Sequence, residues 1–267
     1  MHASILRLTF SLFLLSAVFF FIERVFGRGR KQPLLRKGLI VDAFYWFFTP
    51  LVTKWISRTS MILPVGLLVL MGVATFEEFT SGAYHGFGPL SQQPIWLQVI
   101  EIYLLADFFG YWSHRLFHGR LWWPFHAVHH SSEDLDWLSS VRVHPVNDLV
   151  NKFLEASPLL LLGFNPFVTL STAPVFTLYA IFLHANVDWD FGPLRGILAT
   201  PVFHRWHHAK DREAWDKNFA GLFVFWDRIF GTYADESRAC DRLLGLEEVN
   251  PETSLSIRHI LGAPFGH

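Results

Sequence analysis

The chain has 267 residues, of which 51% are hydrophobic and only 17% are charged. Soluble domains are about a quarter charged, so this chain has too few charged groups to cover its own surface. The composition therefore favours an integral membrane protein. The net charge of −1 lacks the basic excess of a nucleic-acid-binding protein, so no nucleic-acid partner is expected. The single cysteine, Cys240, excludes an intrachain disulfide and a cysteine-based zinc site.

Three apolar runs precede residue 113 and are candidates for membrane helices. The first covers residues 3–22 and is interrupted only by Arg7. We expect it to be a retained helix rather than a signal peptide, because no small-residue cleavage site follows it. Residues 59–76 form a second, uncharged run, and residues 95–112 form a third, weaker one.

Two further segments complete the predicted membrane region. Residues 41–56 are apolar but contain two charges and a proline, and they suit a helix lying in the membrane interface. Residues 156–187 hold no Asp, Glu, Lys or Arg, and the turn sequence at 163–166 divides them. We therefore predict a helical hairpin over 147–162 and 167–186. The expected fold is an all-α membrane bundle of about four to five spans or half-spans with interfacial helices.

The distribution of positive charge predicts the orientation of this bundle. A basic segment follows the first helix and marks its side as cytoplasmic, whereas residues 77–94 contain no Lys or Arg, as an external loop should. The third run and the hairpin then return to the cytoplasmic side. The basic residues are Arg28, Arg30, Lys31, Arg36 and Lys37.

We expect one membrane-embedded domain over residues 1–267. Within it, residues 1–100 supply N-terminal membrane helices and residues 101–230 form a histidine-rich core. Residues 231–267 turn charged and lose periodicity, which is typical of a tail packed on the cytoplasmic part or loosely ordered.

Histidine is the anomaly of this sequence, because ten of its fourteen histidines lie between His114 and His208. One pair is spaced i, i+4, and two triplets are spaced i, i+3, i+4, so each set shares a helix face. Imidazole suits iron, copper, zinc or nickel. Since one metal takes four to six ligands, nine histidines are enough for two metal sites, forming a cap on the cytoplasmic face. The predicted ligands are His114, His118, His126, His129, His130, His184, His204, His207 and His208.

Other polar residues are candidates for orienting these rings. Asp107 lies on the helical stripe of His114 but two turns away, so we expect it to hold a histidine of another cluster. His144 precedes Pro145, where capping or ring support is favoured over metal binding. The remaining candidates are Asn186, Asp188 and Asp211, while His2, His85, His259 and His267 are interpreted as ordinary polar residues.

Several reaction classes are excluded by missing motifs. The chain contains no His-Glu-x-x-His of a zinc protease and no Glu-x-x-His of a carboxylate-bridged di-iron bundle. It also lacks Gly-x-Gly-x-x-Gly and Gly-x-Ser-x-Gly. We therefore expect no flavin, haem or nicotinamide site within the chain, and any redox chemistry needs electrons from outside.

The order and spacing of these motifs resemble the fatty acid hydroxylase/sterol desaturase superfamily of integral membrane enzymes. The resemblance covers about residues 100–230. It rests on Asp107-Phe-Phe-Gly-Tyr111-Trp112-Ser-His114-Arg115-Leu-Phe-His118, His126-x-x-His129-His130, Arg142-x-His144-Pro145, His184-x-Asn186 and His204-Arg205-Trp-His207-His208.

This resemblance implies a cytoplasmic di-iron centre that oxidises lipid C–H bonds with O2. It implies eight ligands from the histidine pair and the two triplets, with His184 matching a further family histidine. It also implies a lipid substrate, two Fe ions and an external electron donor of the cytochrome b5, ferredoxin or rubredoxin type. Hydroxylation and desaturation both stay open, and purified protein could carry zinc.

The residues alone leave two other function classes open. Imidazole also suits Zn²⁺, so a zinc-dependent membrane hydrolase or isomerase is one alternative. A metal transporter or storage protein is the other, although the predicted spans contain few polar residues beyond Asp42, Glu101 and Asp107.

Overall fold

The computed structural model describes residues 2–27, 32–234 and 243–246. Within these residues the fold is helical, without β-strands, and its extended pairings are the isolated bridges Leu198–Phe223 and Ala209–Leu244. The α-helices are α1 (His2–Phe26), α2 (Leu39–Ser60), α3 (Ile62–Leu70), α4 (Phe76–Ser81), α5 (Gly88–Ser91), α6 (Ile95–Phe117), α7 (Trp123–His130), α8 (Pro145–Leu162), α9 (Pro166–Leu183), α10 (Pro201–His207) and α11 (Phe225–Ile229). Three 3-10 segments, η1 (Trp137–Val141), η2 (Gly192–Gly196) and η3 (Arg212–Ala214), connect them.

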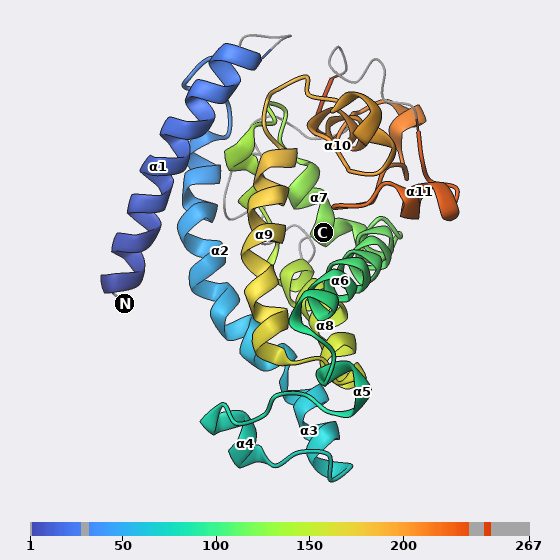
Figure 1. The fold of residues 1–267 in the computed structure, drawn as a ribbon. Helices are drawn as coiled ribbons and strands as arrows, with labels where there is room; N and C mark the ends of the chain where they lie inside the picture. Colours follow the sequence, from blue (N-terminus) through green and yellow to red (C-terminus); the bar gives the residue numbers. More distant parts are fainter. Residues whose placement is uncertain (1, 28–31, 235–242, 247–267) are drawn as a thin grey trace.

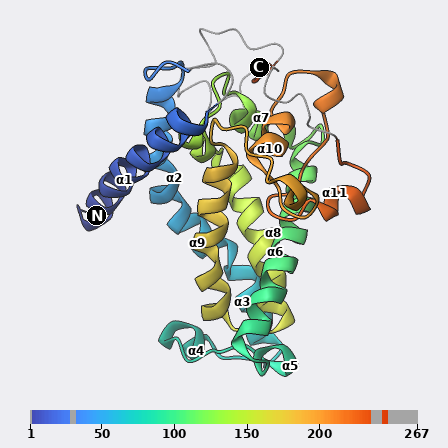
Figure 2. The same ribbon diagram turned by 45° about the horizontal axis from the view of Figure 1, so that its top comes forward.

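The longer helices run side by side along one axis, and the short ones close the two ends (Figure 1). Helix α8 packs against both α2 and α6, and α9 packs against α6 and η1. Helices α7, α10 and α11 gather at one end of the bundle, whereas α3, α4 and α5 lie at the other (Figures 1 and 2). The all-α prediction is therefore confirmed for the described part of the chain.

The predicted helical hairpin is confirmed as α8 and α9. Asn165 ends the turn, because its side chain accepts a hydrogen bond from the backbone N–H of Phe167 at 2.9 Å. Gly163 begins it with φ of 99°, in the left-handed region that glycine adopts without strain. A Cβ at this position would lie 2.2 Å from the carbonyl oxygen of Phe87, so the close approach of the preceding loop also requires glycine.

The prediction of one span over 59–76 is wrong, because α3 ends at Leu70 and α4 begins at Phe76. Helix α2 includes all of 41–56 and runs lengthwise against α8, and α3 continues it for only nine residues (Figure 1). Asp42 suggested a wet interface, but its carboxylate is buried and bonded to Arg142 at 2.6 Å. A buried charge is tolerated when it is paired, so Asp42 does not require an aqueous interface.

Two described helices are long and apolar enough to cross a bilayer, namely Ser4–Phe26 and Pro166–Leu183. The run predicted over 95–112 forms α6, which has the length of a span but carries Glu101 and Asp107. Residues 39–52 and 58–70 form shorter apolar stretches. The number of crossings thus stays a prediction.

The chain alternates between the two ends of the bundle as expected. The end of α1 and the start of α2, with Arg36 and Lys37 before it, lie at the end that holds α7 and α10 (Figure 1). The loops around α4 and α5 lie at the opposite end. Arg28, Arg30 and Lys31 fall outside the described residues, as does most of the tail expected over 231–267.

Helix α1 is joined to the histidine-bearing end by one buried cluster. The ring of Phe19 stacks on Trp137 at 5.3 Å, and Trp46 of α2 meets Trp137 edge-on at 5.7 Å. The Glu23 carboxylate accepts the backbone N–H of Asn186 at 2.9 Å. These contacts position the segment that follows His184.

Candidate metal centre

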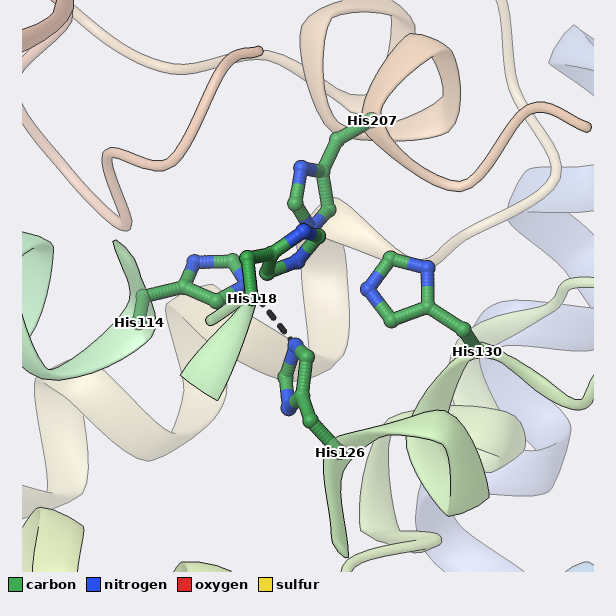
Figure 3. A group of neighbouring side chains, drawn as sticks. All are labelled: His114, His118, His126, His130 and His207. Atoms are coloured by element: carbon green, nitrogen blue, oxygen red, sulfur yellow. Dashed lines mark hydrogen bonds between the residues drawn. The ribbon is translucent and has the colours of Figure 1, made fainter. Parts of the chain in front are cut away.

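The structure brings all nine predicted histidines together at one end of the bundle, in two groups. Group A contains five rings and group B contains four, and within each group the candidate ligand atoms lie within 4.8 Å of one another. The groups adjoin, because the rings of His130 and His208 stack at 4.3 Å. Figure 3 shows the rings of group A converging from three helices. Group A is His114, His118, His126, His130 and His207; group B is His129, His184, His204 and His208.

Helical geometry explains how the motifs divide. At about 100° per residue, positions i and i+4 lie about 40° apart, while i+3 lies about 60° to the other side of i. The triplet on α7 accordingly sends His126 and His130 to group A and His129 to group B. The triplet on α10 does the reverse, sending only His207 to group A. Each triplet therefore serves both groups.

Capping residues and prolines determine where the two short histidine-bearing helices, α7 and α10, begin. Helix α10 follows Thr200, whose side chain accepts the backbone N–H of Phe203 at 3.1 Å, and Pro201 occupies its first turn. Helix α7 likewise has a proline, Pro124, in its first turn. Helix α7 ends at its last histidine, His130, and helix α10 ends at His207, directly before His208.

Six of the nine rings have an oxygen acceptor at Nδ1, and for five of them it is a carbonyl or amide oxygen; the sixth, His118, has the carboxylate of Asp216. Carbonyl oxygens of Phe219, Ala180 and Lys217 lie 2.7 Å from the Nδ1 atoms of His114, His184 and His207 respectively. The side-chain oxygen of Asn147 lies 2.7 Å from His126 Nδ1, and the carbonyl oxygen of Arg142 lies 3.3 Å from His129 Nδ1. A carbonyl oxygen only accepts, so these rings carry their proton on Nδ1 and present an Nε2 lone pair.

The Nε2 atoms then face one another without a proton between them. The distance is 3.1 Å between His114 and His126 and also between His129 and His184. Two cis nitrogen ligands of a divalent ion such as zinc, each about 2.0–2.1 Å from the metal, are separated by about 2.9–3.4 Å. Converging buried lone pairs are costly unless a cation lies among them. The residues present therefore fit a metal ion in each group.

Burial keeps these rings neutral and ready to bind metal. Seven of the nine histidines are buried and His114 and His118 are half-buried. Burial first, and then the charge of neighbouring imidazoles, holds the pKa of the rings on α7 and α10 well below the usual 6.5. The Nε2 atoms of His118, His130 and His207 have no hydrogen-bond partner among the described residues. Neutral imidazole nitrogens that lack a hydrogen-bond partner are available to bind a metal ion.

The polar residues predicted to support the rings have other partners. Asp107 accepts the backbone N–H of Phe223 at 2.8 Å rather than a histidine, because the intervening loop comes between it and the rings. His144 caps α8 by accepting the N–H of Val146 at 3.1 Å, as the sequence favoured. Asn186 accepts from Arg205 at 2.9 Å.

The last two candidates lie in the segments that follow α9 and α10. Asp188 is half-buried in the segment after α9, and Asp211 is half-buried at the start of η3. His85 lies in the loop at the opposite end of the bundle and contacts Phe167, consistent with its interpretation as an ordinary residue.

Sequence reasoning missed the side chains that do contact the rings. Asn147 holds His126, and Asp216 lies 3.3 Å from His118 Nδ1. Asn147 falls three residues after His144 at the start of α8, and it is fully buried. A buried polar residue so close to the histidine motifs was the available signal, but no fixed spacing distinguishes it.

Residues 99–232, half of the chain, match the family described as fatty acid hydroxylase. The chain belongs to the fatty acid hydroxylase family. The match includes all nine histidines of the two groups, so the family region and the candidate metal centre coincide.

Curated relatives in this family are similar over different lengths. Ornithine lipid hydroxylase OlsE of Rhizobium tropici is 34% identical over 73% of this chain and 59% of its own length. Human alkylglycerol monooxygenase is 38% identical over 51% of this chain and 30% of its own. The chain thus spans less than two thirds of these two relatives. The C-4 methylsterol oxidase erg25 of Schizosaccharomyces pombe is 30% identical over 78% of this chain and 67% of its own length. No solved structure matches the chain significantly.

Proposed function

We propose that this protein is a membrane-embedded oxygenase that hydroxylates a C–H bond of a lipid, with one iron ion in each histidine group. The observation that carries the proposal is the convergence of nine neutral imidazoles into two groups at one end of an apolar bundle. His114, His118, His126, His130 and His207 would hold one iron, and His129, His184, His204 and His208 the other.

The chemistry of the substrate explains why such a centre is needed. An unactivated C–H bond resists acid, base and nucleophile, so the bound iron pair would supply the O2 chemistry that side chains cannot. In hydroxylation one oxygen atom enters the C–H bond and the other leaves as water. Two electrons and two protons must come from outside, because the chain has no cofactor motif. An external electron-transfer protein of the cytochrome b5, ferredoxin or rubredoxin type is the proposed source.

The chain's own residues would exclude water and keep the rings in place. The aromatic ring of Phe219 packs edge-on against His114 and His118 at 5.5 and 4.9 Å. Phe117 is fully buried beside His126. Such apolar walls favour electrostatic interactions inside the site by removing bulk water.

The surface of the bundle supports a lipid substrate that stays in the bilayer. Helices α1 and α9 expose large apolar side chains along their length, including Phe13, Phe21, Leu170 and Leu178. A lipid chain beside these helices would reach the histidine end without leaving hydrocarbon. The names of the relatives, a hydroxylase, a monooxygenase and an oxidase of lipids, favour hydroxylation over desaturation. Arg36 and Lys37 directly precede α2, which begins at the histidine-bearing end of the bundle, and these basic residues favour a cytoplasmic face for that end.

The test is a comparison of membrane lipids from cells that make the protein or its His129→Ala variant. The active protein should convert one lipid class to a product heavier by one oxygen, only in the presence of O2 and a reductase system. Ornithine lipids, alkylglycerols and methylsterols are the first substrates to supply. Turnover that persists without O2 would favour the zinc-dependent alternative, and full activity of His129→Ala would overturn the assignment of the centre.

A further inference from the structure

One short segment contacts three of the five histidines of group A. Asp216 Oδ1 lies 3.3 Å from His118 Nδ1, and the carbonyl oxygens of Lys217 and Phe219 lie 2.7 Å from His207 and His114 Nδ1. These three partners fall within four consecutive residues. We call residues 216–219 the strap.

The strap has an unusual backbone. Asp216 and Asn218 have φ of 55° and 59°, in the left-handed region that most residues avoid. Asp and Asn are the non-glycine residues that tolerate this conformation best. Because left-handed residues alternate with ordinary ones, the chain turns so that one side chain and two carbonyl groups reach the rings.

The strap is in turn held by buried side chains. The Asp227 carboxylate accepts the backbone N–H groups of Phe219 and Ala220, both at 2.8 Å, and the hydroxyl of Thr232 at 2.7 Å. Asn218, fully buried, accepts the N–H of Ala234 at 2.8 Å. Asp227 therefore fixes the residue whose carbonyl orients His114.

Group B is supported differently. His184 uses a carbonyl one turn back in its own helix, and His129 uses the carbonyl of Arg142. The Nδ1 atoms of His204 and His208 have no hydrogen-bond partner in the described part of the chain. Within the part of the chain that the structure describes, no hydrogen bond joins a strap residue to a group B ring, so disturbing the strap should leave group B in place.

We infer that the strap sets the metal affinity of group A separately from group B, and that Asp216 and Asp227 are positioning residues for it. This inference rests on the metal centre of the proposed function. Asp216 orients His118 directly, and Asp227 acts through Phe219 on His114. Loss of such ring-orienting contacts weakens metal binding by about 10–100-fold.

The test measures iron per chain after dialysis of the full-length protein against a graded chelator series. Asp216→Gly keeps the left-handed backbone but removes the acceptor, and Asp227→Asn places an amide N–H₂ against a backbone donor. Both should retain one tightly bound iron and release the other about 10–100-fold more readily than the unsubstituted protein. Asp216→Asn keeps an acceptor oxygen and should retain both. The exposed Asp190, paired with Arg195 away from the rings, supplies the control Asp190→Asn.

Mössbauer spectra of iron-enriched protein identify which iron is lost. Asp216→Gly should lose the spectral component that survives in the group B variant His129→Ala. Equal affinity of both irons in Asp216→Gly, joint loss of both, or loss in Asp216→Asn would overturn the inference. Because Asp216 has a 73% exposed side chain, Asp216→Gly decides the question even if Asp227→Asn fails to fold. Absence of iron from the unsubstituted protein would instead overturn the metal centre itself.

Discussion

Replacing Asp42 with asparagine should destabilise the protein strongly, because it leaves a buried charge without its counterion. The Asp42 carboxylate is fully buried and bonds Arg142 at 2.6 Å and Arg36 at 2.7 Å, and both guanidinium side chains are 1% exposed. Arg36 keeps a second carboxylate partner in Asp136, whereas among the described residues Arg142 forms its ion pair with Asp42. Removing one partner of a buried ion pair costs about 3–5 kcal/mol. For a chain of this size, that loss lowers Tm by about 6–20 °C.

The assay is thermal unfolding of the detergent-solubilised protein, with Asp148→Asn as the matched control. Asp148 pairs with Lys152 at 2.9 Å one turn away, but this pair is partly exposed. Its loss should cost less than about 0.5 kcal/mol. In a double variant, Arg142→Met should recover part of the stability lost in Asp42→Asn, because both buried charges are then removed. Equal Tm values for Asp42→Asn and Asp148→Asn, or additive effects in the double variant, would refute this reasoning.

Three further predictions follow from the same contacts. Gly38→Ala should lower Tm, because Gly38 has φ of 79° and an added Cβ would lie 2.6 Å from Arg142 Nη2; a Tm equal to that of the unsubstituted protein would contradict the packing. Asn147→Ala should weaken iron binding about 10–100-fold, as measured by chelator competition, whereas Asn147→Asp keeps the acceptor to His126 and should bind normally. Metal-free protein should lose stability as the pH falls below about 6.5: burial depresses the pKa of the rings on α7 and α10, so the unfolded chain binds more protons than the folded chain there. Tm measured at pH 8 and at pH 5.5 checks this, and a higher Tm at the lower pH would contradict it.

The histidines could be predicted from sequence because their information is local. Spacing of three and four residues puts rings on one helix face wherever the helix packs. The hairpin turn at Gly163 is local for the same reason. Spacing separates i and i+4 from i+3 in each triplet, but which of the two groups each part joins depends on how the helices pack, which no spacing specifies.

The supporting contacts could not be predicted because they depend on long-range packing. Two of the strap's three contacts to the rings come from backbone carbonyls, of Lys217 and Phe219, and any residue type carries a carbonyl. Asp107 was expected to orient a histidine ring, but its carboxylate instead accepts the backbone N–H of Phe223. Asp42 suggested an interfacial helix, since its partner Arg142 lies 100 residues away in sequence.

Iron-edge anomalous diffraction from crystals of the purified protein tests the central claim most directly. The account predicts two iron peaks per chain, one among His114, His118, His126, His130 and His207 and one among His129, His184, His204 and His208. Active protein with no iron peak in either group, or with iron bound elsewhere in the chain, would contradict it.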